Sequence, residues 1–152
     1  MILYLDTSAL VKLYVAEDGS DVVRNAVGVA QTVATSRVAY AEARAALAAA
    51  ARMGRIGDVE RATAVSVFRA EWRLFSIVNV TQPLVEFAAE LAESHALRGF
   101  DAIHLASSVF LLQRTQEDVR FLAWDKALLK AAAETGLQTN WWSGTPDADG
   151  PR

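Results

Sequence analysis

The stretch ILYLDTSALVKLY, residues 2–14, changes from a β pattern to a helical pattern partway along. Residues 2–5 are apolar without alternation, which is typical of a short strand buried on both faces. The residues that follow have helical spacing, and Asp6, Thr7 or Ser8 can cap the helix that they predict. A buried strand that leads directly into a helix is typical of proteins in which parallel strands alternate with helices.

The rest of the chain repeats this alternation. The stretches 76–80 and 119–124 are again apolar on both faces, and a brief strand is predicted at 32–36. This pattern predicts an α/β fold with three layers, α/β/α, in which helices cover both sides of a central parallel sheet. GRIGD (54–58) predicts the turn of a helical hairpin. The predicted helices cover residues 20–30, 38–53, 58–74, 82–97, 101–114 and 126–136, and a last strand is predicted at 137–142.

Length and composition predict a single domain. The chain has 152 residues, 53% of them hydrophobic, which is enough for one substantial core. We place this domain at residues 1–142 and predict a disordered tail at 143–152, SGTPDADGPR. MILYLD lacks the features of a signal peptide, and no apolar run approaches the roughly 20 residues that span a bilayer. We therefore expect a cytoplasmic protein with no membrane segment.

Charge is unevenly distributed along the chain. The net charge of −3 argues against a protein that coats nucleic acid nonspecifically. Residues 36–73, however, hold seven arginines and four acidic residues, so the predicted hairpin is basic and the remainder is acidic. Arginines on helices most often form a solvated face, and the alternative is that they guide a phosphate backbone.

Four acidic residues stand among apolar neighbours in four separate segments. Asp6 and Asp125 each follow a predicted strand. We expect Gly99 to end one helix, so that Asp101 in RGFDAIHLA (98–106) lies in the first turn of the next. Each of these residues taken alone could be a helix cap or a surface acid. On a helical wheel, Glu42 shares a face with Val38, Ala45, Ala46 and Ala49.

Taken together, these acids predict a metal site. The carboxyl ends of parallel strands meet at one edge of a sheet, where four carboxylates would repel one another unless a positive charge lay between them. No lysine or arginine adjoins the strand ends at Asp6 and Asp125 on the apolar side. The chain has no cysteine and two histidines, so oxygen ligands suited to Mg²⁺ or Mn²⁺ are expected. Such ions typically act on phosphate esters.

Four segments in order carry a family resemblance: YLDTSALVKLY, TSRVAYAE, RGFDAIHLA and FLAWDKALLKAA. They closely resemble the PIN-domain ribonucleases, among them the VapC toxins of bacterial toxin–antitoxin pairs, and the resemblance extends to about Leu137. One departure is Ala123, where relatives often have Thr or Ser, and it concerns the surroundings of Asp125. The resemblance implies that the family's acids are Asp6, Glu42, Asp101 and Asp125, that its hydroxyl is Ser8, and that Thr7 and Ser36 support them.

The resemblance implies an endoribonuclease that depends on Mg²⁺ or Mn²⁺ and leaves a 5′-phosphate and a 3′-hydroxyl. Asp6, Glu42 and Asp101 would hold the metal most directly, and Asp125 would complete the acidic pocket or a second ion site. A homodimer and a VapB-like antitoxin are also implied. We expect the antitoxin to place an Arg or Lys in the acidic pocket, with the alanine-rich stretch 45–54 as a candidate contact.

Other hypotheses and other residues remain open at this point. We expect RNA to follow the helices that carry Arg37 and Arg44, although a solvated face or an antitoxin contact would also explain them. A catalytically inactive PIN-like module that binds RNA or protein predicts lost acids, and all four are present. A haloacid-dehalogenase-type phosphatase would have D-x-D after the first strand, and position 8 is Ser. We interpret His104, Trp141 and Trp142 as packing residues more readily than as site residues.

Overall fold

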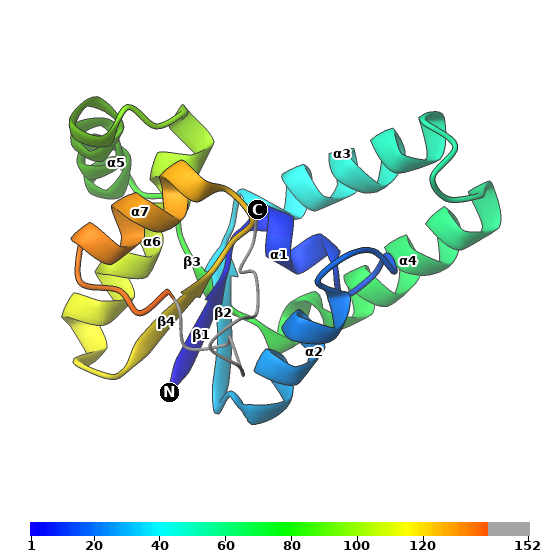
Figure 1. Cartoon of the computed structure of the whole chain (residues 1–152), viewed down its shortest axis with the longest axis horizontal. Helices are drawn as coiled ribbons and strands as arrows, with labels where there is room; N and C mark the ends of the chain where they lie inside the picture. Colours follow the sequence, from blue (N-terminus) through cyan, green and yellow to red (C-terminus); the bar gives the residue numbers. More distant parts are fainter. Residues whose placement is uncertain (140–152) are drawn as a thin grey trace.

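A parallel β-sheet forms the middle layer of the protein, seen here in a computed structural model that describes residues 1–139 (Figure 1). Its strands are β1 (Ile2–Leu5), β2 (Thr32–Ser36), β3 (Ser76–Val78) and β4 (Val119–Leu122). The order within these described residues is β3-β2-β1-β4, and each neighbouring pair is parallel. The first strand of the chain is therefore central, with Tyr4 opposite both Ala34 and Phe121.

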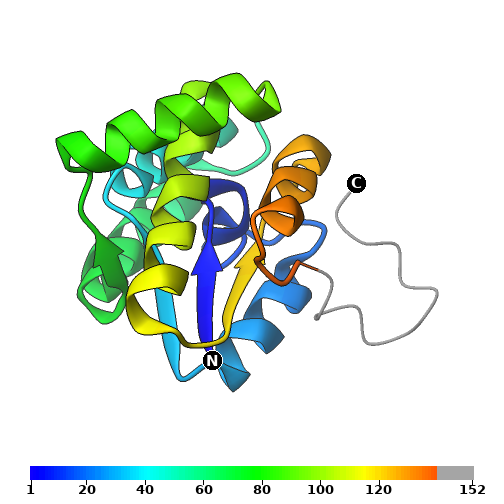
Figure 2. The same ribbon diagram turned by 90° about the vertical axis from the view of Figure 1, so that its left-hand side faces the viewer.

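Helices cover both faces of this sheet, which confirms the predicted α/β/α layers (Figure 2). On one face lie α5 (Gln82–His95), α6 (Gly99–Thr115) and α7 (Lys126–Glu134), and on the other lie α1 (Thr7–Val11), α2 (Ser20–Val29), α3 (Ala39–Arg52) and α4 (Asp58–Glu71). The first group packs Leu84, Leu105 and Leu128 against the sheet. The second group packs Leu10 and Phe68 against the opposite face. The strands are therefore buried on both sides, as continuous apolar strands require.

Helices α3 and α4 form the predicted helical hairpin, which extends sideways from the sheet in Figure 1. Gly54 follows α3 with a left-handed φ of 72°, a conformation that glycine adopts without strain. Gly57 precedes α4 directly. A short 3₁₀ turn, Trp72–Leu74, then leads from α4 into β3.

Several predicted boundaries are wrong by a few residues. Helix α5 ends at His95 because Ala96 takes a left-handed φ of 53°, and Gly99 lies in the first turn of α6 instead of ending α5. The third strand stops at Val78, since its partner β2 has no residue beyond Ser36 with which to continue the ladder. The last predicted strand, 137–142, is represented by a bridge between Arg120 and Gln138, and its residues from 140 onward lie outside the described part.

The predicted tail, 143–152, also lies outside the described residues. Among the helices in residues 1–139, none combines the length and apolar character needed to cross a bilayer.

Candidate active site

A cavity of about 500 Å³ opens at the carboxyl edge of the sheet, where ligands bind in open α/β proteins. Asp6 lies in its wall directly after β1, and Asp125 lies there shortly after β4. Glu42 of α3 and Asp101 of α6 line the same cavity from the helices on the two sides of the sheet. The structure thus brings together the four carboxylates that the sequence singles out, although they come from distant parts of the chain.

Asp6 is buried and held by local hydrogen bonds. Its carboxylate caps α1 by accepting from the Ala9 N–H at 2.9 Å, and the Ser8 hydroxyl donates to it at 2.7 Å. Burial raises the pKa of Asp6 to about 6, although the nearby His104 and the hydrogen bonds from Ser8 and Ala9 oppose the shift, and the charge of Asp101 adds to it. The ionised form of Asp6 is therefore disfavoured, as expected of a carboxylate placed to meet a cation.

Ser8 joins the two strand ends that carry Asp6 and Asp125. Its hydroxyl donates to Asp6 and accepts from the backbone N–H of Trp124 at 3.0 Å. The loop after β4 is therefore tied to the start of α1 beside the cavity. This contact explains why a hydroxyl side chain stands at position 8 in the segment YLDTSALVKLY.

Glu42 is the carboxylate with the most specific partners. Its Oε1 accepts from the Thr7 hydroxyl at 2.8 Å and from His104 Nε2 at 2.7 Å. Burial alone would raise the pKa of Glu42, but the hydrogen bond and charge of His104, together with Thr7, bring it below its ordinary value. Glu42 is therefore ionised and fixed near neutral pH.

The helical face predicted for Glu42 needs a correction. The core face of α3 is formed by Ala39, Ala43, Leu47 and Ala50, and Ala45 is exposed. Glu42 lies at the border of this face, on the side where Ala46 and Ala50 line the cavity. A helical wheel at 100° per residue shows on which face of a helix a side chain lies, but it does not show whether that face packs in the core or lines a cavity.

Arg98 supplies a positive charge at the site, contrary to the expectation that no basic residue adjoins it. Its Nε lies 3.0 Å from Asp101 Oδ2, and one terminal nitrogen lies 3.8 Å from Asp125 Oδ2. It was missed because it comes from the start of α6, not from a strand end. The Arg98 side chain is 81% exposed, so water screens both ion pairs and the repulsion among the carboxylates is only partly offset.

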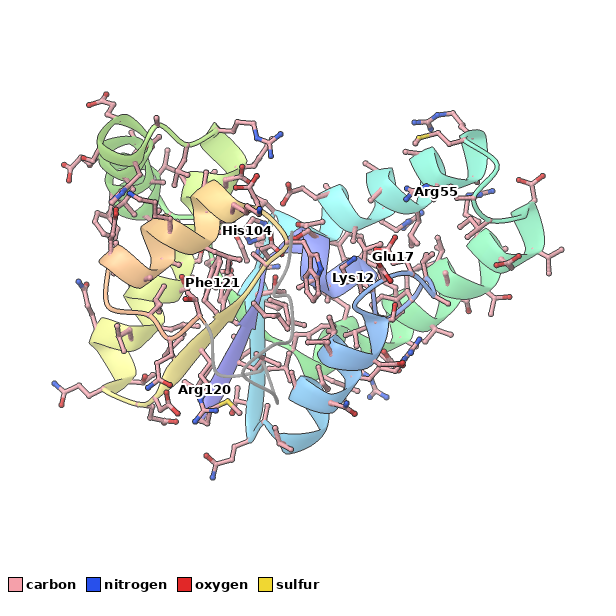
Figure 3. All side chains as sticks on the ribbon, viewed as in Figure 1. Lys12, Glu17, Arg55, His104, Arg120 and Phe121 are labelled. Atoms are coloured by element: carbon pink, nitrogen blue, oxygen red, sulfur yellow. The ribbon has the colours of Figure 1, made fainter. Side chains whose placement is uncertain are left out.

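Lys12 lies in another wall of the same cavity. Its ammonium group donates to Glu17 at 3.0 Å and to the Asp18 carbonyl at 2.8 Å, and it lies 4.6 Å from the Trp124 ring centroid. Arg55 approaches the other oxygen of Glu17 at 3.7 Å (Figure 3). Lys12 therefore holds the loop between α1 and α2 in place.

Other predicted residues lie away from the carboxylates. Ser36 is fully buried and accepts from the Val38 N–H at 3.4 Å, so it supports the start of α3. Arg37 is exposed and donates to Asn79 at 2.7 Å, and Arg44 is exposed on α3. Neither arginine lines the cavity within the described residues. Trp141 and Trp142 lie outside the described part of the chain.

The donor set fits a hard divalent cation. Carboxylate oxygens from four segments face one cavity, and the raised pKa of Asp6 is the expected response of a buried acid that has other acids nearby. In residues 1–139, no group of three or more His, Asp or Glu side chains is arranged so that it could hold a metal ion without rearrangement. Mg²⁺ suits this arrangement, because it is commonly held by one or two carboxylates and completes its shell with water.

Comparison with known proteins places this chain in a family. The model of the PIN domain matches residues 3–116. The chain belongs to the PIN-domain family. Ribonuclease VapC49 of Mycobacterium tuberculosis (strain H37Rv) is 36% identical over 137 residues, which covers 90% of this chain and 93% of the relative. Ribonuclease VapC47 of Mycobacterium tuberculosis (strain CDC 1551) is 31% identical over 141 residues, 90% and 94% of the two chains.

Solved structures show the same PIN-domain fold. The FitAcB structure from Neisseria gonorrhoeae has a TM-score of 0.65 at 17% identity, covering 91% of this chain and 96% of that one. Mycobacterium tuberculosis VapC20, described as a sarcin–ricin loop cleaving toxin, has a TM-score of 0.61 at 19% identity, covering 85% and 94%. The PIN-domain match contains Asp6, Glu42 and Asp101 and stops before Asp125.

Proposed function

We propose that this PIN-domain protein is the endoribonuclease toxin of a toxin–antitoxin pair, and that it hydrolyses RNA phosphodiester bonds with the help of Mg²⁺ or Mn²⁺. The observation that carries the proposal is the convergence of four carboxylates from distant segments on one cavity at the carboxyl edge of the sheet. Relatives named as VapC ribonucleases, similar over nine-tenths of this chain, support RNA as the substrate.

Each site residue has a distinct part in this mechanism. Asp6, Glu42 and Asp101 would hold the divalent ion, and Asp125 would complete the acidic pocket. The bound ion would supply Lewis acidity and neutralise charge on the phosphate. Ser8 orients Asp6, and Thr7 with His104 orients Glu42. A water attacks the phosphorus in line with the departing 3′ oxygen, which leaves a 5′-phosphate and a 3′-hydroxyl.

Metal dependence is tested first with chelator. The purified protein should be inactive in excess EDTA and regain activity on addition of Mn²⁺ or Mg²⁺, since four carboxylates without a cation would repel a phosphate. Cleavage of RNA that proceeds unchanged in EDTA would contradict the metal mechanism.

Asp101→Asn tests the carboxylates directly. We expect cleavage to fall at least about 100-fold, because loss of a metal ligand should exceed the 10–100-fold effects of residues that only support ligands. Asp21→Asn is the matched control, since Asp21 is also a first-turn acid paired with an arginine three residues away, at 3.0 Å. Sequencing of RNA 5′ ends after expression of each variant measures the effect and locates the cleavage sites.

An antitoxin and a second copy of the chain are the proposed protein partners. We propose that the antitoxin inserts an Arg or Lys among Asp6, Glu42, Asp101 and Asp125, because the cavity attracts cations and Ala46 and Ala50 leave room beside it. A toxin–antitoxin complex from Klebsiella pneumoniae shares the fold, with a TM-score of 0.57 at 18% identity over 81% of this chain and 86% of that one.

The partners are tested separately. Co-expression with the product of the adjacent reading frame, followed by pull-down and a growth assay, should show binding and neutralisation. A toxic chain that no neighbouring product neutralises would contradict the toxin role and leave the nuclease role standing. Light scattering of the purified chain should give the mass of a homodimer.

A further inference from the structure

His104 connects the central strand of the sheet to a carboxylate of the cavity. It lies on α6, three residues after Asp101, and its side chain is 2% exposed. Its Nδ1 is 2.9 Å from the Tyr4 hydroxyl oxygen, and its Nε2 is 2.7 Å from Glu42 Oε1. Both ring nitrogens therefore have hydrogen-bond partners: Tyr4 of β1 at Nδ1, and Glu42 of α3 at Nε2, where Thr7 of α1 also lies 3.1 Å away.

The contact with Glu42 determines where the imidazole proton lies. An ionised carboxylate only accepts hydrogen bonds, so the ring nitrogen 2.7 Å from Glu42 Oε1 must carry a hydrogen. Burial raises the pKa of Tyr4 well above its ordinary value, so its hydroxyl keeps its hydrogen and can donate to Nδ1. Nε2–H therefore donates to Glu42, and the Tyr4 hydroxyl is the partner of Nδ1 whether the ring is neutral or charged.

The ring of His104 has little freedom to tilt. Tyr4 stacks on Phe121 with centroids 5.5 Å apart and planes 6° apart, and it meets His104 edge-on at 6.0 Å and 73°. Tyr4 and Phe121 lie opposite each other on the paired strands β1 and β4 and are fully buried. The ring whose Nε2–H faces Glu42 is therefore packed against a buried aromatic pair of the sheet.

Two donors act on the same oxygen of Glu42. Thr7 donates to Oε1 at 2.8 Å, beside His104 at 2.7 Å, and within the described residues no hydrogen bond falls on Oε2. We propose that His104, supported by Tyr4, is a positioning residue that holds Glu42 so that Oε2 alone is presented to the metal ion. This inference rests on the metal-dependent activity proposed above and deepens it.

Metal binding should therefore require the Nε2–H of His104 as a hydrogen-bond donor to Glu42. A glutamate has three rotatable side-chain bonds, and without a fixed partner its carboxylate would have to be ordered by the metal itself. Outer partners of metal ligands typically change metal affinity by about 10–100-fold when they are removed. His104 should therefore affect metal affinity more than it affects binding of RNA.

Two amide variants separate positioning from packing. In His104→Gln the amide N–H reaches the place of Nε2, whereas in His104→Asn it reaches only the place of Nδ1. We expect Mn²⁺ affinity, measured on the purified full chain without RNA by electron paramagnetic resonance of free Mn²⁺, to fall about 10–100-fold for His104→Asn and to stay within a few-fold for His104→Gln. Tyr4→Phe should give a smaller loss of affinity than His104→Asn, because the ring keeps its Nε2–H.

Controls and a second measurement make the outcome decisive. His95→Gln should leave Mn²⁺ affinity unchanged, since His95 contacts Glu134 away from the cavity. The Mn²⁺ concentration for half-maximal RNA cleavage should rise for His104→Asn while KM for RNA at saturating Mn²⁺ does not, and circular dichroism should show both variants folded.

Each alternative outcome would contradict a different part of the proposal. Equal Mn²⁺ affinity of the folded Asn and Gln variants would overturn the role of His104 and leave the metal mechanism standing. A wild-type chain that binds no Mn²⁺ would overturn the metal mechanism, and the positioning role with it. If His104→Asn does not fold, a wild-type affinity in Tyr4→Phe together with a large loss in His104→Gln would overturn the proposal.

Discussion

Asp6 combines two opposing effects in one residue. Its carboxylate caps α1, which favours the folded chain, but burial beside other acids disfavours its ionised form. A capping residue in an ordinary exposed position would have no such conflict. A bound cation would relieve this conflict, so an acid that helps to fold the chain would also be stabilised in its ionised form by a metal ion.

This conflict predicts a pH dependence of stability. The folded chain holds the pKa of Asp6 at about 6 against an ordinary 3.8, so it takes up a proton as the pH falls through 6 while the unfolded chain does not until about 4. The free energy of unfolding in EDTA should therefore rise by about 1 kcal/mol from this residue between pH 7 and pH 5. Urea titrations of wild type and Asp6→Asn measure it as the difference between the two profiles.

Glu42 does not contribute to the change in stability between pH 7 and pH 5. The pKa of Glu42 is lowered, so its contribution is lost only below the ordinary range of a glutamate and does not enter this pH window. Parallel profiles for wild type and Asp6→Asn would show that Asp6 is not the strained acid. An unfolded Asp6→Asn would show that the helix cap outweighs the burial of charge.

At the level of elements, the loop between α1 and α2 is fitted closely to the loop after β4. Gly19 has a left-handed φ of 86°, and a Cβ at this position would lie 2.3 Å from the Trp124 ring. The Trp124 backbone in turn donates to Ser8, which donates to Asp6. Two loops from opposite ends of the chain therefore determine each other's position next to the site.

Substitution of Gly19 should disturb both loops. We expect Gly19→Ala to lower the free energy of unfolding by about 1–3 kcal/mol, from backbone strain and the clash with Trp124. Gly28→Ala is the control, because a Cβ there meets nothing within 4 Å and lies on a helix, where alanine should add about 0.5–1 kcal/mol. Thermal or urea unfolding of both variants, with near-ultraviolet circular dichroism as a probe of Trp124, provides the measurement; similar stabilities would contradict the close fit.

The layers of the fold can be predicted from the sequence, but one helix boundary and some side-chain contacts cannot. Continuous apolar strands and their alternation with helices predict the layers, and the strand-end position of Asp6 and Asp125 predicts which edge carries the site. The break before α6 was misplaced because Ala96, a residue with no special preference, adopts the left-handed conformation that Gly99 was expected to supply. Arg98 pairs with Asp101 three residues away at the start of α6, whereas the contact of His104 with Glu42 depends on how α6 is placed against α3 and leaves only residue types in the sequence.

Charge is distributed unevenly over the whole molecule, and this distribution predicts where RNA binds. Arg37 and Arg44 are exposed and belong to the basic segment 36–73 of an otherwise acidic chain. Replacing both with Gln should weaken RNA binding and reduce the slope of log K against log salt by about 1.4, the value for two contacts to single-stranded phosphates. Arg24→Gln with Arg114→Gln, also exposed but outside this segment, should leave the slope unchanged. Binding measured over a salt series decides, and equal slopes would assign Arg37 and Arg44 to a solvated face or to the antitoxin.

The strand order affects when, during synthesis, the proposed nuclease can become active. β1 is made first, yet one of its two neighbours, β4, is made last, and Asp125 follows it. Domains fold as units during synthesis, and a central strand that still lacks a neighbour cannot complete its sheet. We therefore expect the nascent chain to remain harmless to the message being translated until nearly all of it has left the ribosome, which gives an antitoxin that is already present time to reach the finished domain.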